Sequence, residues 1–167
     1  RSLEYLMDTA FQAGLNVSEL SMENIGWNGT AFVDLHQQEI QHLFKLYPWE
    51  WIWEENFSQF LKPETEWIEP CWKMLLSNKA LLIELWKRFP NHPLLLETHA
   101  YDAHAHYAGK WVRKPILARE GANIHILQNN VDCGAASGSF YFDDYDKYGY
   151  VMQRWVKTPL HEGMLPT

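Results

Sequence analysis

Residues 110–127 read KWVRKPILAREGANIHIL, and the interpretation of the whole chain starts from this stretch. Its two halves, 111–117 (WVRKPIL) and 122–127 (ANIHIL), are rich in branched apolar residues, which favour β-strands. The tetrapeptide between them, at 118–121, ends in Gly121, which can adopt turn conformations without steric cost. The pattern predicts a β-hairpin with a charged, glycine-bearing tip.

The segments on either side of this hairpin predict further strands and one helix. LLLETHA (94–100) and YVMQRWV (150–156) have the composition of strands, whereas 129–149 is rich in Gly, Ser, Asn and Asp and reads as a loop with one short strand at 139–142. A helix is predicted over 78–89, with Ser77-Asn78 as its cap, because apolar residues recur there at helical spacing. They are Leu81, Leu82, Leu85, Trp86 and Phe89.

The N-terminal part predicts a mixture of the same elements. A helix over 3–11 is expected to end at Gly14, and two or three strands are expected within 17–47, with Asn28-Gly29 as a tight turn in which both residues tolerate positive φ. A second helix is expected to begin near Pro48, and Pro63-Glu64 marks a break. The chain is therefore predicted to be an α/β (α+β) protein.

Composition excludes several classes of protein. The chain has 167 residues, is 47% apolar and carries a net charge of -7, with acidic and basic residues interspersed. This argues against a nucleic-acid surface. No run approaches the roughly 18 to 20 apolar residues of a membrane helix, and no signal peptide is visible, so we expect a cytoplasmic protein without a membrane partner. The two cysteines, Cys71 and Cys133, lack the spacing of a zinc site.

The two ends of the sequence suggest a piece of a larger protein. The first residue is Arg1 and the last residues, GMLPT (163–167), resemble an interrupted loop. We therefore expect a fragment of a longer chain.

Several residues are candidates for binding phosphate. Such a site needs cations and backbone NH groups that can approach the phosphate oxygens closely. Lys79 lies at the start of the predicted helix, and Lys114 lies on a predicted strand. Arg119, at the hairpin tip beside Gly121, could donate paired hydrogen bonds to phosphate oxygens. Taken alone, each lysine reads as an ordinary solvated side chain, and a glycine hairpin is usually just a turn.

An aromatic and acidic segment, KLYPWEWIWEE (45–55), is a second candidate site. Trp49, Glu50, Trp53 and Glu54 could bind a polyamine with ring faces and carboxylates together. The alternative interpretation is a packed helix with a solvated acidic face. Metal sites at His104 and His106, or at Asp143, Asp144 and Asp146, are disfavoured because neither group has the spacing that a metal requires.

Four blocks occur in the order and spacing of one known family. They are EPCW (69–72), SNKALL (77–82), VRKP (112–115) and REGAN (119–123). With KLYPWEWIWEE and YVMQRWV, they resemble the glutathionylspermidine synthase family and its bacterial acid–amine ligase relatives, over about residues 3 to 160. Cys71, Leu76 and the segment HAYDAHAHYAGK (99–110) depart from the family's pattern, which puts the identity of the substrate in doubt.

The resemblance implies a fold and a set of site residues. Residues 1–60 would be part of a Rossmann-like pre-ATP-grasp region, and 61–167 part of an ATP-grasp region with a lid hairpin at 110–128. Lys79 and Lys114 would hold the phosphates of ATP. The loop Arg119, Glu120, Gly121, Ala122 and Asn123 would cover these phosphates, with Arg119 as a catalytic residue. Met152, Gln153, Arg154 and Trp155 would contact the adenine.

The resemblance also implies an activity for the complete protein. Such enzymes use ATP and Mg²⁺ to convert a carboxylate into an acyl phosphate, which an amine then attacks. The carboxylate could come from a glutathione-like peptide and the amine from a polyamine. The magnesium ligands and a catalytic arginine would lie outside this sequence, so the isolated chain is expected to be inactive. An inactive ATP-binding regulatory relative and a nucleotide-independent aromatic binding module remain alternatives.

Overall fold

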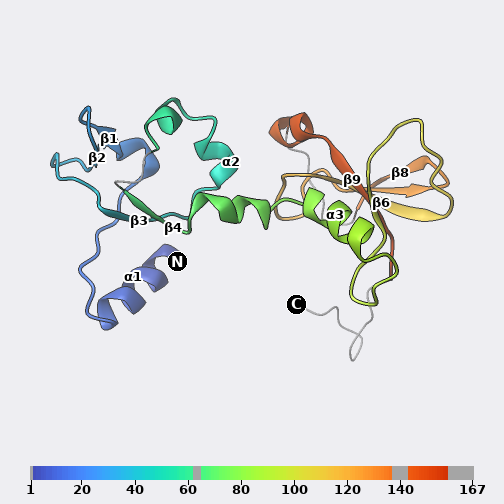
Figure 1. Cartoon of the computed structure of the whole chain (residues 1–167), viewed down its shortest axis with the longest axis horizontal. Coiled ribbons are helices and arrows are strands. Elements are labelled where there is room, and N and C mark those ends of the chain that lie inside the picture. The colour runs from blue at the N-terminus through green and yellow to red at the C-terminus, as the bar shows by residue number, and fades with distance from the viewer. Residues whose placement is uncertain (1, 62–64, 137–142, 158–167) are drawn as a thin grey trace. The chain divides into compact units, whose positions relative to one another are not determined.

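A computed structural model describes residues 2–61, 65–136 and 143–157 of the chain (Figure 1). Contacts divide the chain into two compact units, Arg1–Met74 and Leu75–Thr167. Both units contain helices and strands, which confirms the predicted mixed α/β class. The assignment of residues 1–60 and 61–167 to pre-ATP-grasp and ATP-grasp regions stays a prediction.

The first unit opens with helix α1 (Ser2–Gln12), as the sequence predicts. The helix ends in a Schellman motif, in which the NH of Leu15 donates to the carbonyl of Ala10 (3.0 Å) and that of Gly14 to the carbonyl of Phe11 (2.9 Å). Gly14 has a φ of 82°, a value that a residue with a Cβ rarely adopts. The glycine therefore fixes the end of the helix.

A short antiparallel hairpin follows, formed by β1 (Gly26–Trp27) and β2 (Phe32–Val33). Its turn is at the predicted place, but it takes four residues, 28–31, and only Gly29 has a positive φ (103°). The reason is the Asn28 side chain, whose Oδ1 accepts hydrogen bonds from the NH groups of Thr30 (2.9 Å) and Ala31 (2.8 Å). This Asx-type turn replaces the tight turn predicted for Asn28-Gly29.

The rest of the first unit is built around a parallel pair of strands, β3 (His42–Phe44) and β4 (Glu66–Ile68). The crossover between them contains the single-turn helix α2 (Trp49–Ile52) and the 3₁₀ turn η2 (Asn56–Phe60). Helix α2 begins after Pro48 as predicted and is only four residues long. The core of the unit is a cluster of buried side chains: Phe32, Trp49, Ile52 and Trp67.

The first unit also contains two 3₁₀ turns that the sequence did not predict. Residues Met22–Asn24 (η1) lie within the segment for which strands were predicted, and Cys71–Leu75 (η3) ends at the first residue of the second unit. The predicted break at Pro63-Glu64 lies outside the described residues.

The second unit is organised by an antiparallel sheet of five strands in the order β5-β9-β6-β7-β8. The strands are β5 (Thr98–Ala100), β6 (Lys110–Pro115), β7 (His125–Gln128), β8 (Val131–Ala135) and β9 (Tyr150–Arg154). Helix α3 (Ala80–Arg88) packs beside β5, and the 3₁₀ turn η4 (Asp143–Tyr148) leads into β9 (Figure 1).

The predicted hairpin of residues 110–127 is confirmed as β6 and β7, which pair from Lys110↔Gln128 to Arg113↔His125. The predicted strand at 150–156 is confirmed as β9, and the helix predicted over 78–89 is confirmed as α3. The strand predicted over 94–100 is present only at its end, as β5. In Figure 1 the C-terminal strand β9 lies beside β6, although the two are far apart in sequence.

Strand β8 corrects the prediction of a loop over 129–149. It forms a two-residue hairpin with β7, in which Asn129 and Asn130 both have positive φ (49° and 67°). These values fit a type I′ turn, whose twist matches that of paired strands. All five residues of β8 are exposed, so backbone pairing forms the strand without any apolar side-chain pattern. The short strand predicted at 139–142 lies outside the described residues.

The cap of α3 gives a stability prediction. The Oδ1 of Asn78 accepts a hydrogen bond from the NH of Ala80 (2.8 Å), which satisfies one of the free NH groups at the helix start. Asn78→Ala is expected to lower the free energy of unfolding by about 1 kcal/mol. Asn78→Ser should keep most of that stability, as measured by denaturant unfolding. Equal stability of the Ala and Ser variants would show that this cap contributes nothing.

Candidate functional site

Lys79 joins the start of α3 to the segment that follows β6. Its backbone NH donates to the carbonyl of Ile116 (3.0 Å), and its Nζ donates to the carbonyl of Ala118 (2.8 Å). Both acceptors lie just beyond Pro115, where β6 ends. The ammonium group is therefore held at the end of β6, next to the hairpin tip.

Lys114 lies on β6 itself, near the same end of the strand. Its Nζ donates a hydrogen bond of 2.7 Å to Oε1 of Gln153 on the adjacent strand β9. Burial lowers the pKa of the Lys114 ammonium, because a partly dehydrated cation is harder to keep charged. The structure thus brings the two predicted lysines to one end of β6 by way of separate elements, α3 and β9.

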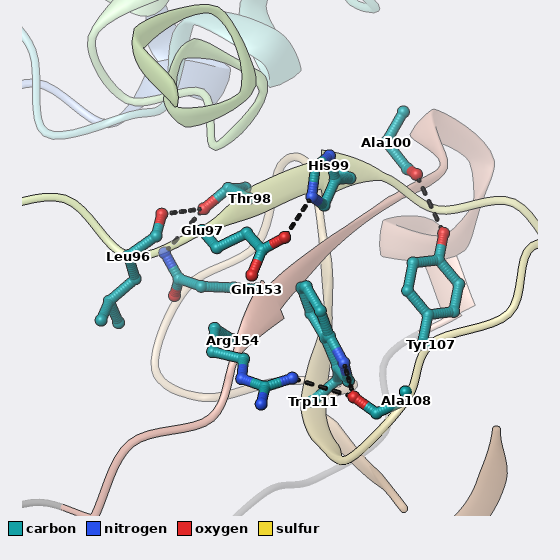
Figure 2. A network of polar contacts seen from close by, with 10 residues as sticks. All are labelled: Leu96, Glu97, Thr98, His99, Ala100, Tyr107, Ala108, Trp111, Gln153 and Arg154. Atoms are coloured by element: carbon teal, nitrogen blue, oxygen red, sulfur yellow. Dashed lines mark hydrogen bonds and ion pairs between the residues drawn. The ribbon is translucent and has the colours of Figure 1, made fainter. Parts of the chain in front are cut away.

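The Gln153 side chain is itself part of a hydrogen-bonded chain that reaches β5 (Figure 2). Its Nε2 lies 3.2 Å from Oγ1 of Thr98, and Oγ1 of Thr98 donates to the carbonyl of Leu96 at 2.9 Å. Gln153 and Thr98 are both buried, and they are directly opposite each other in the β5–β9 register. Sequence reasoning did not single out Thr98, because an isolated threonine in a strand carries no motif.

Arg113, the neighbour of Lys114, has different surroundings. Successive side chains of a strand point to opposite faces of the sheet. The Arg113 guanidinium lies over the rings of Tyr101 (5.4 Å) and Tyr150 (5.0 Å) and is 3.7 Å from Oδ2 of Asp132. Arg113 is therefore engaged in packing on its face, whereas Lys114 is on the other.

Asp132 is also bound by His125, whose Nδ1 is 2.9 Å from Oδ2 of the carboxylate. Burial tends to raise the pKa of Asp132, but the NH of Gly134, His125 and Arg113 together outweigh it and hold this pKa below its usual value. Through these contacts Asp132 links β8 to His125 on β7 and to Arg113 on β6. We assign it a structural role.

The predicted phosphate-covering loop, Arg119 to Asn123, is a compact turn. The NH of Ala122 donates to the carbonyl of Arg119 (3.0 Å), and Nδ2 of Asn123 donates to Oδ1 of Asp146 in η4 (2.7 Å). Ala122 and Asn123 are buried, whereas Glu120 is exposed. Glu120, Gly121 and Asn123 all have positive φ, so the backbone is tightly curved. The role of this loop at a nucleotide stays a prediction.

The predicted adenine contact, Met152 to Trp155, lies on or next to β9, which pairs on both sides. The NH of Arg154 donates to the carbonyl of Glu97 (2.8 Å), and the NH of Trp155 donates to the carbonyl of Lys110 (3.1 Å). Met152 is fully buried in the sheet. Contact of this segment with adenine stays a prediction, and in this structure both of these NH groups already donate to neighbouring backbone carbonyls.

The predicted polyamine surface is divided between core and solvent. Trp49 and Glu50 are buried in the first unit, and Nζ of Lys45 lies 4.6 Å from the centre of the Trp49 ring. Trp53 is 47% exposed, and Glu54 is exposed. Two of the four side chains are therefore buried and two are exposed, and a polyamine site at these residues stays a prediction.

The described residues contain neither a cluster of metal ligands nor a membrane-spanning helix. No three His, Cys, Asp or Glu side chains in the described part of the chain gather to hold a metal ion. Within those same residues, no helix has the length and apolar character needed to cross a membrane.

A match to a known family covers the whole chain: residues 1–167 match the family described as glutathionylspermidine synthase preATP-grasp. The chain belongs to this family. Its resemblance to glutathionylspermidine synthases and acid–amine ligases, predicted from the sequence blocks, is thereby confirmed.

Three relatives of the chain have names that describe ligases or synthetases. The chain is 45% identical over 170 residues to a Haemophilus influenzae protein named "Putative acid--amine ligase", covering 99% of the chain and 43% of that protein. It is 24% identical over 168 residues to the bifunctional glutathionylspermidine synthetase/amidase of Escherichia coli, covering 82% of the chain and 26% of the relative. It is 26% identical over 115 residues to the trypanothione synthetase of Crithidia fasciculata, covering 53% and 18%. The chain thus spans less than half the length of each.

The environment of Lys114 gives a prediction about titration. Because burial lowers its pKa, the Lys114 ammonium is expected to lose its proton below the usual pH for a lysine. The unfolded chain then holds a proton that the folded chain has released between the two pKa values, so stability should rise with pH across that interval. NMR titration of labelled lysines, with Lys114→Met to assign the signal, tests this. A Lys114 signal that titrates at the ordinary lysine value would contradict the assigned burial.

Proposed function

We propose that this chain supplies part of the nucleotide site of an ATP-dependent ligase that joins a carboxylate to an amine. The observation that carries the proposal is that Lys114 lies near the end of β6 and that Lys79 binds the segment just beyond it. Membership of the glutathionylspermidine synthase family supports the ligase class. The ATP-grasp nature of the second unit is part of the same proposal.

The chemistry explains why positive charge is needed at this site. A carboxylate oxygen attacks the terminal phosphorus of ATP, ADP leaves, and an acyl phosphate forms. The amine nitrogen then attacks the acyl carbon, loses a proton, and inorganic phosphate leaves as the amide bond forms. Negative charge on the transferred phosphoryl oxygens has to be neutralised and held in place, which positioned ammonium groups can do.

The hydrogen bonds of the two lysines are suited to exchange with a phosphate. Lys114 donates to the neutral amide of Gln153, so this hydrogen bond does not cancel the positive charge. A phosphate oxygen offers a charge-assisted hydrogen bond, which is stronger than one to a neutral carbonyl. Partial burial of Lys114 strengthens its attraction to an anion further, because the effective dielectric constant is lower there.

Magnesium is expected with ATP, but the residues that the structure describes do not form a site for it. The described residues contain no group of three acidic, His or Cys side chains that could hold the ion. We therefore assign no residue of this chain to magnesium and route no step through it.

The substrates are proposed from the relatives. The names of two relatives, a glutathionylspermidine synthetase/amidase and a trypanothione synthetase, point to peptide and polyamine substrates. We propose a peptide-like carboxylate and a polyamine-like amine as the first pair to test. A polyamine site made of Trp49, Glu50, Trp53 and Glu54 is not favoured, because Trp49 and Glu50 are buried.

Removal of either lysine should abolish most of the ligase activity in the intact protein. For Lys114→Met and Lys79→Met, we expect amine-dependent release of ADP and phosphate to fall by about 10- to 100-fold, the usual loss for a hydrogen bond between charged groups. The assay uses magnesium ATP with glutathione-like peptides and polyamines.

Lys87→Met is the matched control for these variants. Lys87 is on the exposed face of α3, paired with Glu84 at 2.7 Å, so its loss should leave turnover unchanged. Turnover that survives both lysine substitutions would overturn the proposed site. Tight ATP binding without ADP formation for any substrate pair would instead support the regulatory alternative.

A further inference from the structure

Two buried polar side chains, Thr98 and Gln153, are linked to Lys114 by hydrogen bonds. Thr98 has no exposed surface and Gln153 is 8% exposed. Buried hydroxyl and amide groups are costly unless all their hydrogen bonds are made, so their presence in a sheet calls for an explanation. Their side-chain hydrogen bonds form a single chain, which runs from the carbonyl of Leu96 through Thr98 and Gln153 to Nζ of Lys114.

The chain of hydrogen bonds determines which end of the Gln153 amide faces Lys114. A threonine hydroxyl has one proton, and here it is donated to the carbonyl of Leu96 (2.9 Å). The Thr98 oxygen can then act only as an acceptor toward Gln153, so the amide must present its NH₂ group to Thr98 at 3.2 Å. Its carbonyl oxygen is left to face Lys114, which can only donate.

We propose that Thr98 and Gln153 are positioning residues that hold the Lys114 ammonium in the direction of the nucleotide phosphates. The proposal rests on the proposed function, in which Lys114 contacts those phosphates. Thr98 acts indirectly. Its hydroxyl orients the Gln153 amide, and the amide oxygen in turn orients the Lys114 ammonium. Neither side chain has to touch the nucleotide.

The neutral amide at position 153 is essential to this arrangement. A carboxylate there would also accept a hydrogen bond from Lys114, but it would neutralise the charge that is needed at the phosphate. An apolar side chain would leave the ammonium without an acceptor and free to adopt other rotamers. An amide fixes the direction of the lysine and preserves its charge.

A nearby hydroxyl provides a control for purely structural effects. The Tyr107 hydroxyl also accepts one hydrogen bond, from the NH of Asp102 (3.0 Å). It donates one to the carbonyl of Ala100 (3.2 Å; Figure 2). Tyr107 packs against Trp111, which is three residues from Lys114 on β6 and therefore points to the opposite face. Tyr107→Phe removes the same number of hydrogen bonds without reaching Lys114.

The test compares Thr98→Val, Thr98→Ser and Tyr107→Phe in the intact protein, with ATP affinity and turnover measured separately. Thr98→Val should weaken ATP binding by about three- to tenfold, the range for loss of one ordered hydrogen bond. Thr98→Ser restores the hydroxyl and should bind ATP within about twofold of the wild type. Tyr107→Phe should lose thermal stability to a similar extent as Thr98→Val but keep its ATP affinity.

Gln153→Glu and Gln153→Met give a second route that does not depend on how Thr98→Val folds. Both should weaken ATP binding by about tenfold or more, Glu by neutralising Lys114 and Met by removing its acceptor. If Thr98→Val and Gln153→Met bind ATP as Tyr107→Phe does, the positioning proposal is overturned. If Lys114→Met itself binds ATP like the wild type, the fault lies in the proposed function, and the positioning proposal falls with it.

Discussion

The pairing of β6 with β9 is the interaction on which the candidate site depends. These strands are distant in sequence, yet their register places Gln153 opposite Val112 and diagonal to Lys114, within reach of a long side chain. The same pairing sends Arg113 to the other face, where Tyr101 and Tyr150 enclose it. A shift of one residue would exchange these two cations between the faces. The register therefore decides which cation is available for an anion and which one is structural.

Around this pairing, two further contacts complete the end of β6. Lys79 binds the carbonyls of Ile116 and Ala118, so the start of α3 is attached where the strand ends. On the far side of β9, β5 supplies Thr98, which closes the hydrogen bonding of Gln153. The cost of burying a lysine, an amide and a hydroxyl is offset because each has a partner. A rigid arrangement of this kind is what an electrostatic site for phosphate needs before the nucleotide arrives.

Much of the second unit could be predicted from sequence, because its signals are local. The β6–β7 hairpin, α3 and β9 each have a run of apolar residues with the right period, and the two lysines stand in recognisable blocks. Strand β8 was missed because its side chains are all exposed. The Asn129-Asn130 turn was its one local signal in the sequence. Thr98 was missed for another reason: its role depends on the pairing of β5 with β9, which is a long-range contact. Composition alone could not tell which tryptophans of the Trp-rich segment are buried: Trp49 is 4% exposed and Trp53 is 47% exposed.

The most direct test of the account is a crystal structure of the intact protein with a non-hydrolysable ATP analogue and magnesium. The account predicts that Nζ of Lys79 and Nζ of Lys114 both lie within hydrogen-bonding distance of phosphate oxygens, with Gln153 still bound to Thr98. It would be contradicted by a nucleotide whose phosphates lie elsewhere while Lys79 still binds the carbonyl of Ala118 and Lys114 still binds Gln153.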